Sequence, residues 1–191
     1  MTDSSTLDSL NGQQYLVLRP EHEIASFWDA TRDSLRRGMP ATVSFPNTGH
    51  VTLRGFSEPT RIDDLEEILR AWAERQAPIR LRVEAIDGFP PPFQILIARL
   101  QRTSSLIAAY AGLTSLLDTK GIHRLGELPL EEWVFHMSLI YAGTLDQAEW
   151  HRVYGNSARA LDPCPSELIT SADFVWYADG IEHVSTLDFG G

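Results

Sequence analysis

Two short stretches of the chain repeat one pattern of residue types that can transfer protons. His-Val-Thr-Leu at residues 50–53 recurs as His-Met-Ser-Leu at residues 136–139. Histidine can give or take a proton near neutral pH, because its unperturbed pKa is about 6.5. A hydroxyl two positions further on can donate a hydrogen bond to an oxygen on which negative charge develops. The repeat therefore indicates paired acid and base catalysis on a substrate that carries an anionic group.

Both copies lie in stretches that we expect to form β-strands, where side chains at positions i and i+2 point to the same face. His50 and Thr52 then project together, as do His136 and Ser138. If the two strands are related by a pseudo-twofold axis, two imidazoles and two hydroxyls line one cleft. Such a cleft suits cleavage of a phosphodiester: one imidazole takes a proton from the attacking oxygen and the other protonates the leaving oxygen.

The two copies resemble the signature of the 2H phosphoesterase superfamily, which includes the bacterial and archaeal 2′-5′ RNA ligase and cyclic phosphodiesterase proteins. The resemblance covers about residues 15–189, although only the two motifs are specific. It implies an α+β, bilobal fold in which two pseudo-symmetric α/β units place antiparallel sheets around a central cleft. It also implies that His50 and His136 are catalytic and that Thr52 and Ser138 bind phosphate.

Members of that superfamily cleave 2′,3′-cyclic phosphates or 2′-5′ linkages, and some ligate RNA ends. We therefore expect an enzyme that cleaves such a phosphodiester in a nucleotide or at an RNA terminus, without a cofactor. The other histidines have no partner at metal-ligand spacing, so we expect no metal site. Three alternatives stay open: a catalytically silent nucleotide-binding module, an RNA 2′-5′ ligase or processing factor, and a structural protein with coincidental motifs.

Counting alternate positions along the first motif strand places Arg54 and Phe56 on the face of His50, as candidate substrate contacts. Arg54 could reach a phosphate or ribose, and Phe56 could stack on a base. The same counting places Tyr141 on the face opposite His136, which disfavours a role for it. For the further candidates, core packing, ion pairing or solvent exposure is the favoured interpretation: Tyr15, Trp176, Tyr177, Arg19, Arg80 and Arg82.

Composition limits the class of partner. The net charge of −10 argues against binding along a long nucleic acid, which needs many basic residues, but leaves open a small nucleotide or an RNA end. No apolar run approaches the roughly 20 residues that span a bilayer. The single cysteine, Cys164, is typical of a reducing compartment. We expect a cytoplasmic protein that does not bind membranes and has no obligate protein partner.

Apolar periodicity predicts a mixture of strands and helices. We expect a flexible tail at residues 1–12 and a single bilobal domain at 13–191. A hinge between its halves is expected at the prolines 90–92, and Thr60 and Thr144 are expected to begin helices as N-caps. Strands are expected at 15–18, 41–45, 50–56, 79–86, 93–100, 133–141, 172–177 and 181–189, and helices at 21–37, after Thr60, at 103–117 and from Thr144 toward residue 160.

Overall fold

The computed structural model describes residues 10–191, so most of the expected tail lies outside the described residues. In chain order the elements are β1 (Gln14–Leu18), α2 (Glu23–Arg36), β2 (Val51–Phe56), α3 (Ile62–Ala73), β3 (Ile79–Phe89), β4 (Ile95–Leu100), α4 (Ser104–Asp118), β5 (Arg124–Leu125), β6 (His136–Tyr141), α5 (Gln147–Ser157), β7 (Arg159–Ala160), β8 (Ser166–Ile169), β9 (Ser171–Ala178) and β10 (Ile181–Asp188).

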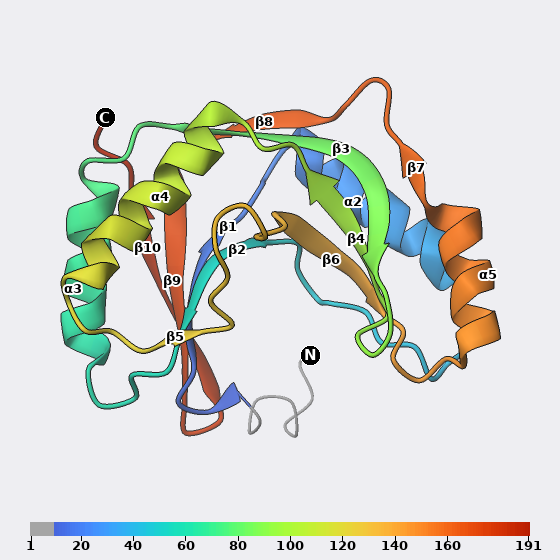
Figure 1. Ribbon diagram of the computed structural model, residues 1–191, viewed down its shortest axis with the longest axis horizontal. Helices are drawn as coiled ribbons and strands as arrows, with labels where there is room; N and C mark the ends of the chain where they lie inside the picture. The colour runs from blue at the N-terminus through green and yellow to red at the C-terminus, as the bar shows by residue number, and fades with distance from the viewer. Residues whose placement is uncertain (1–9) are drawn as a thin grey trace.

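The strands form two antiparallel sheets that carry one motif each (Figure 1). The first sheet has the order β10-β9-β1-β2-β5 and contains the first motif from Val51 onward in β2, with His50 immediately before that strand. The second has the order β6-β4-β3-β7, with β8 paired to the beginning of β3, and contains the second motif in β6. The expected α+β fold with two antiparallel sheets is confirmed.

Helices cross between the two sheets and tie the halves together. Helix α2 follows β1 of the first sheet but packs against β6 and β8 of the second. Helix α4 follows β4 of the second sheet but lies beside α3, which covers β9 and β10 of the first (Figure 1). The prolines 90–92 lie in the turn between β3 and β4, which pair within one sheet. The expected hinge is therefore wrong, because those prolines do not connect the two sheets.

The core follows from the periodicity of the sequence. In β3, Ile79, Leu81 and Val83 are fully buried, while the alternating Arg80 and Arg82 are exposed. In α3 the buried residues recur at helical spacing and pack onto the first sheet. One cluster of buried side chains extends across both sheets, and no helix among the described residues has the length and apolar character needed to cross a membrane.

The two expected threonine caps are wrong. Helix α3 begins after Arg61, and no side chain caps it. Helix α5 begins after Asp146, whose carboxylate accepts from the backbone N–H of Glu149 at 2.8 Å in a reciprocal capping box. Thr144 instead donates from its hydroxyl to a backbone carbonyl 3.0 Å away. The N-cap of α5 is therefore Asp146, which has a glutamate three residues later, and not Thr144.

Glu167 on β8 binds the beginning of α2, where no local side chain forms a cap. Its buried carboxylate accepts from the backbone N–H groups of Glu21, at 2.6 Å, His22, at 3.1 Å, and Ile24, at 3.2 Å. A carboxylate there also interacts favourably with the helix dipole. Glu167, which is far from α2 in the sequence, thus caps the N-terminus of this helix, and the helix packs against the second motif strand, β6.

Candidate active site

Strand β2 contains a β-bulge within the first motif. Thr52 and Arg54 pair with consecutive residues of β1, Val17 and Leu16, which leaves Leu53 without a partner in that strand. A bulged residue interrupts the alternation of side chains, so residues beyond it change face relative to period-2 counting. Arg54 therefore shares the face of the fully buried Leu16 rather than that of Thr52.

The expectation that Arg54 and Phe56 share the face of His50 is wrong for this reason. Arg54 points toward α4, where it donates hydrogen bonds to Tyr110 and Thr114. Phe56 is 0% exposed and belongs to the core. Neither lines the pocket that contains His50.

Strand β6 contains a bulge at the equivalent place in the second motif. Ser138 and Ile140 pair with consecutive residues of β4, so that Leu139 has no partner there. Here the change of face brings Tyr141 to the side of His136 and Ser138, while Leu139 and Ile140 are both buried. The expectation that Tyr141 lies opposite His136 is therefore wrong, because it assumed an unbroken alternation.

His50 and Thr52 line a pocket of about 260 Å³ that reaches from the first sheet to Tyr141 of the second. Two further tyrosines, Tyr15 and Tyr177, contribute to its wall and contact each other edge to face, with ring centroids 6.4 Å apart. Core packing was the favoured interpretation for these tyrosines, and the structure places them at the pocket instead. The remaining lining residues are Leu10, Val17, Arg19 and Val175.

The first described residues and the last strands complete the wall. Gly12 donates its backbone N–H to the carbonyl of Tyr177 at 2.9 Å, which holds residues 10–12 against β9. The hydroxyl of Tyr177 donates to Glu182 at 3.0 Å, and burial beside that carboxylate raises the pKa of Tyr177. Trp176 faces away from the pocket and stacks on His183, with ring centroids 5.1 Å apart.

The two histidine rings are held in the same manner. Nδ1 of His136 lies 2.8 Å from the backbone carbonyl of Val134, two residues earlier. The ring of His50 likewise hydrogen-bonds the backbone of Thr48, two residues earlier. When Nδ1–H donates to a carbonyl, Nε2 is left to exchange a proton. This repetition of ring contacts extends the pseudo-symmetry of the two motifs.

Packing brings the two motifs next to each other. The side chain of Met137 lies directly against Gly49, the residue before His50, in the space that a larger side chain would fill. The indole of Trp28 donates to the backbone carbonyl of Ser138 at 2.8 Å and also packs against Gly49. These contacts join the residue before His50 to the second motif, and the positive charge of a protonated His136 lowers the pKa of His50.

Burial lowers the pKa of both histidines, because the charged imidazolium loses hydration. The positive charges of Arg19 and His136 lower the pKa of His50 further, whereas Glu182 raises it. The hydrogen bond to Val134 opposes part of the effect at His136. Both imidazoles are therefore biased toward the neutral form in the absence of an anionic ligand.

An arginine accompanies each histidine. Arg19 immediately follows β1; its Nε pairs with Asp173 at 2.8 Å and its guanidinium donates to the hydroxyl of Thr48 at 3.1 Å. Arg99 lies directly opposite His136 on β4, and its Nε pairs with Glu84 at 2.9 Å. Sequence reasoning gave Arg19 little weight and did not indicate Arg99, because the position of Arg99 opposite His136 follows only from the register of β4 and β6.

The pocket contains the imidazole of His50, the hydroxyl of Thr52 and Arg19. The second motif, with His136 and Ser138, is not part of that lining but packs next to it through Met137 and Gly49. Among residues 10–191, no group of three or more His, Cys, Asp or Glu side chains is arranged to hold a metal ion. The chemistry that these groups can supply themselves is proton transfer and binding of an anion.

Comparison with known families decides the assignment. The model of the 2′-5′ RNA ligase superfamily matches residues 20–180. The chain belongs to this superfamily. The resemblance to 2H phosphoesterases is thus confirmed, and superfamily membership supports an activity of phosphoesterase or ligase type. A comparison with curated proteins gave no match.

Solved structures share the superfamily fold over nearly the whole chain. TT0787 of Thermus thermophilus is 16% identical, with a TM-score of 0.71 over 94% of this chain and 98% of its own. Escherichia coli LigT in complex with 3′-AMP is 16% identical, with a TM-score of 0.57 over 93% and 95%. Usb1 of Kluyveromyces marxianus is 13% identical, with a TM-score of 0.59 over 95% and 100%. At these identities the likeness shows the fold alone.

Proposed function

We propose that the protein is a metal-independent phosphoesterase that cleaves a 2′,3′-cyclic phosphate or a 2′-5′ linkage of a nucleotide or RNA terminus. His50 and His136 act as acid and base, and Thr52 and Ser138 bind the phosphate. The observation that carries the proposal is the packing of the two motifs, in which Met137 and Trp28 lie directly against Gly49, the residue before His50. Two imidazoles are the groups needed on either side of one phosphorus atom.

The reaction needs one neutral and one protonated imidazole. The neutral one accepts a proton from water as the water oxygen bonds to phosphorus. The bond from phosphorus to the ribose oxygen breaks, and the protonated imidazole gives its proton to that oxygen. Since both pKa values are lowered without substrate, the negative charge of the bound phosphate favours protonation of one ring. The orientation of the substrate decides which histidine acts as base.

The pocket beside His50 supports a nucleotide as the substrate. Tyr15, Tyr141 and Tyr177 offer aromatic faces on which a base can stack. LigT has been solved with 3′-AMP and with NADP+, so a protein of this fold binds nucleotides. The net charge of −10 also favours a small ligand over a long RNA, which would require a basic surface.

Turnover of a substrate panel in EDTA tests the proposal. The panel contains 2′,3′-cyclic nucleotides, 2′-5′ dinucleotides and ADP-ribose cyclic phosphate. We expect cleavage of at least one of them, and a loss of about 10²- to 10⁴-fold on His50→Ala or His136→Ala. His151→Ala, at an exposed position on α5, is the matched control and should retain activity.

Each other outcome contradicts the proposal in a recognisable way. Cleavage that requires a divalent ion would refute the mechanism. Tight nucleotide binding without turnover would indicate a binding module, and net joining of RNA ends would indicate a ligase.

A further inference from the structure

Arg54 is a buried cation outside the candidate active site. Its side chain is 1% exposed, and its Nη atoms donate to the hydroxyls of Tyr110 and Thr114. Its Nε has no hydrogen-bond partner, and the carboxylate of Glu127 is 4.0 Å away, beyond hydrogen-bond distance. Burial lowers the pKa of Arg54, which reflects the cost of holding this charge away from water.

The nearest carboxylate is already engaged by another arginine. The same oxygen of Glu127, Oε1, pairs with Arg124 at 2.9 Å. Arg124 also pairs with Asp118 at 2.8 Å, and Glu127 makes its closer contact with Arg124 rather than with Arg54. Buried charges in proteins are normally paired at hydrogen-bond distance, because an uncompensated charge is strongly destabilising. The guanidinium of Arg54 also lies over the ring of Tyr110, 3.9 Å from its centroid, but has no carboxylate at hydrogen-bond distance among the described residues.

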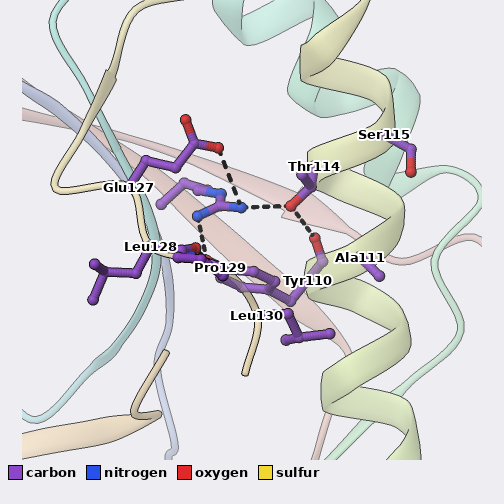
Figure 2. Close-up of a pocket in the computed structure, with 9 residues that line it drawn as sticks. Tyr110, Ala111, Thr114, Ser115, Glu127, Leu128, Pro129 and Leu130 are labelled. Carbon is purple, nitrogen blue, oxygen red and sulfur yellow. Dashed lines mark hydrogen bonds and ion pairs between the residues drawn. The ribbon is translucent and has the colours of Figure 1, made fainter. Parts of the chain in front are cut away.

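Arg54 also lines a cavity of about 480 Å³ between α4 and the segment 127–130, shown in Figure 2. This volume falls in the range of small-molecule sites. The wall is mainly apolar on the side of the segment, where Leu128, Pro129 and Leu130 lie, and Ala111 and Ser115 of α4 border the opposite side. The carboxylate of Glu127 and the hydroxyls of Thr114 and Ser115 also border the cavity. A ligand with one acidic group and an apolar body can use both parts of this wall, in competition with Glu127 for Arg54.

We propose that this cavity is a second ligand site, which binds a small organic acid through an oxyanion at Arg54. The oxyanion, a carboxylate or a phosphate ester, supplies the close contact that Glu127 does not make. The apolar part of the ligand lies against Leu128 and Leu130. The site is distinct from the pocket of His50, because the bulge at Leu53 turns Arg54 to the opposite face of β2.

Four probes separate the contributions of charge and apolar surface. Benzoate carries a carboxylate on a phenyl ring, and phenyl phosphate carries a phosphate on the same ring. Benzyl alcohol has the ring but no charge, and inorganic phosphate has the charge but no ring. Binding is measured by calorimetry and by shifts of backbone amide resonances. We expect benzoate or phenyl phosphate to bind at least about tenfold tighter than benzyl alcohol, as a charge-assisted hydrogen bond provides. The shifts should lie in α4 and at residues 127–130.

Substitutions on one helix provide a matched comparison. Ala111→Trp fills the cavity from an exposed position and leaves Arg54 intact, so it should abolish this binding. Ser115→Trp approaches from the same helix and should act alike. Ala108→Trp, also exposed on α4 but outside the cavity lining, should bind as the unmodified protein does.

Three results would overturn the second site. Binding of the acids no tighter than that of benzyl alcohol would remove the role of Arg54. Equal affinity of the Ala111→Trp and Ala108→Trp proteins for the acids would show that the acids do not bind in this cavity. Resonance shifts confined to the strands around His50 would assign the acids to the catalytic pocket. None of these results bears on the proposed phosphoesterase activity, which is measured separately.

Discussion

Gly49 packs directly against Met137, so that a methyl group on Gly49 would lie 2.6 Å from Cε of Met137. The same methyl group would lie 2.9 Å from Cδ2 of Trp28. Gly49 precedes His50 and Met137 follows His136, so this contact joins the two motifs. The absence of a side chain at position 49 therefore permits the close approach of the strands that carry the histidines.

Gly49→Ala should separate the two motifs while the fold persists. Overpacking at this contact should destabilise the protein by about 1–3 kcal/mol. A displacement of about 1 Å between catalytic groups can cost about 10²-fold in rate, so the loss of kcat should exceed what the fraction unfolded explains. Cyclic nucleotide hydrolysis and thermal unfolding are measured together. Gly112→Ala is the control, because a methyl group there would have nothing within 4 Å. An unchanged kcat in the Gly49→Ala protein would show that the contact of Gly49 with Met137 does not determine the positions of the two histidines.

The pH profile of kcat/KM should be bell-shaped, with its maximum on the acid side of pH 6.5. The profile reports the free enzyme, in which one imidazole must be neutral and the other protonated. Because the pKa values of His50 and His136 are both lowered from 6.5, both limbs move to lower pH. A maximum well above pH 7 would contradict this expectation.

Arg19→Gln should identify the limb to which His50 contributes most. Removal of the positive charge of Arg19 raises the pKa of His50, so that limb should move to higher pH. The apparent pKa values fitted to the profile describe the pair of histidines together. The comparison between the two proteins therefore uses the direction in which the limb moves. Arg80→Gln, at an exposed position on β3, should leave the profile in place.

Tyr141→Leu should weaken substrate binding more than catalysis. Tyr141 is 39% exposed and lines the pocket with His50, so its removal should not disturb the core. Stacking of a base on an aromatic ring contributes about 1–3 kcal/mol, which corresponds to a rise in KM of about tenfold or more. Steady-state kinetics with a 2′,3′-cyclic nucleotide provide the test, and Phe93→Leu, which removes an exposed aromatic ring outside the pocket, is the control. An unchanged KM would exclude a stacking role.

Glu167→Gln should destabilise the fold without altering the site chemistry. The amide cannot match a carboxylate that accepts three backbone N–H groups at the beginning of α2. We expect a loss of about 1–3 kcal/mol in the free energy of unfolding, seen as a lower urea midpoint at unchanged slope. The exposed Glu131→Gln should change stability by less than about 0.5 kcal/mol. Equal midpoints for the two variants would mean that the cap contributes little.

Much of the secondary structure could be predicted from periodicity. The helices at 21–37 and 103–117 correspond to α2 and α4, and the strands at 172–177 and 181–189 correspond to β9 and β10, which pair with each other. The expected strand at 41–45 forms only one bridge, between Ser44 and Tyr141. The short strands β5, β7 and β8 were not expected, because two to four residues carry too little pattern to distinguish a strand from a loop.

The sequence alone determined the family resemblance and the residues of the two motifs. Within each motif, residue type and the i, i+2 spacing specify which side chains share a face, and this holds as far as Thr52 and Ser138, where the bulges begin. Only the tertiary structure decided the faces of Arg54, Phe56 and Tyr141. A bulge belongs to the pairing of two strands, and neither strand shows it in its own pattern. The position of Arg99 beside His136 likewise depends on register, and the cap of α2 depends on a glutamate from a remote strand. Such contacts join distant parts of the chain, so local spacing carries no record of them.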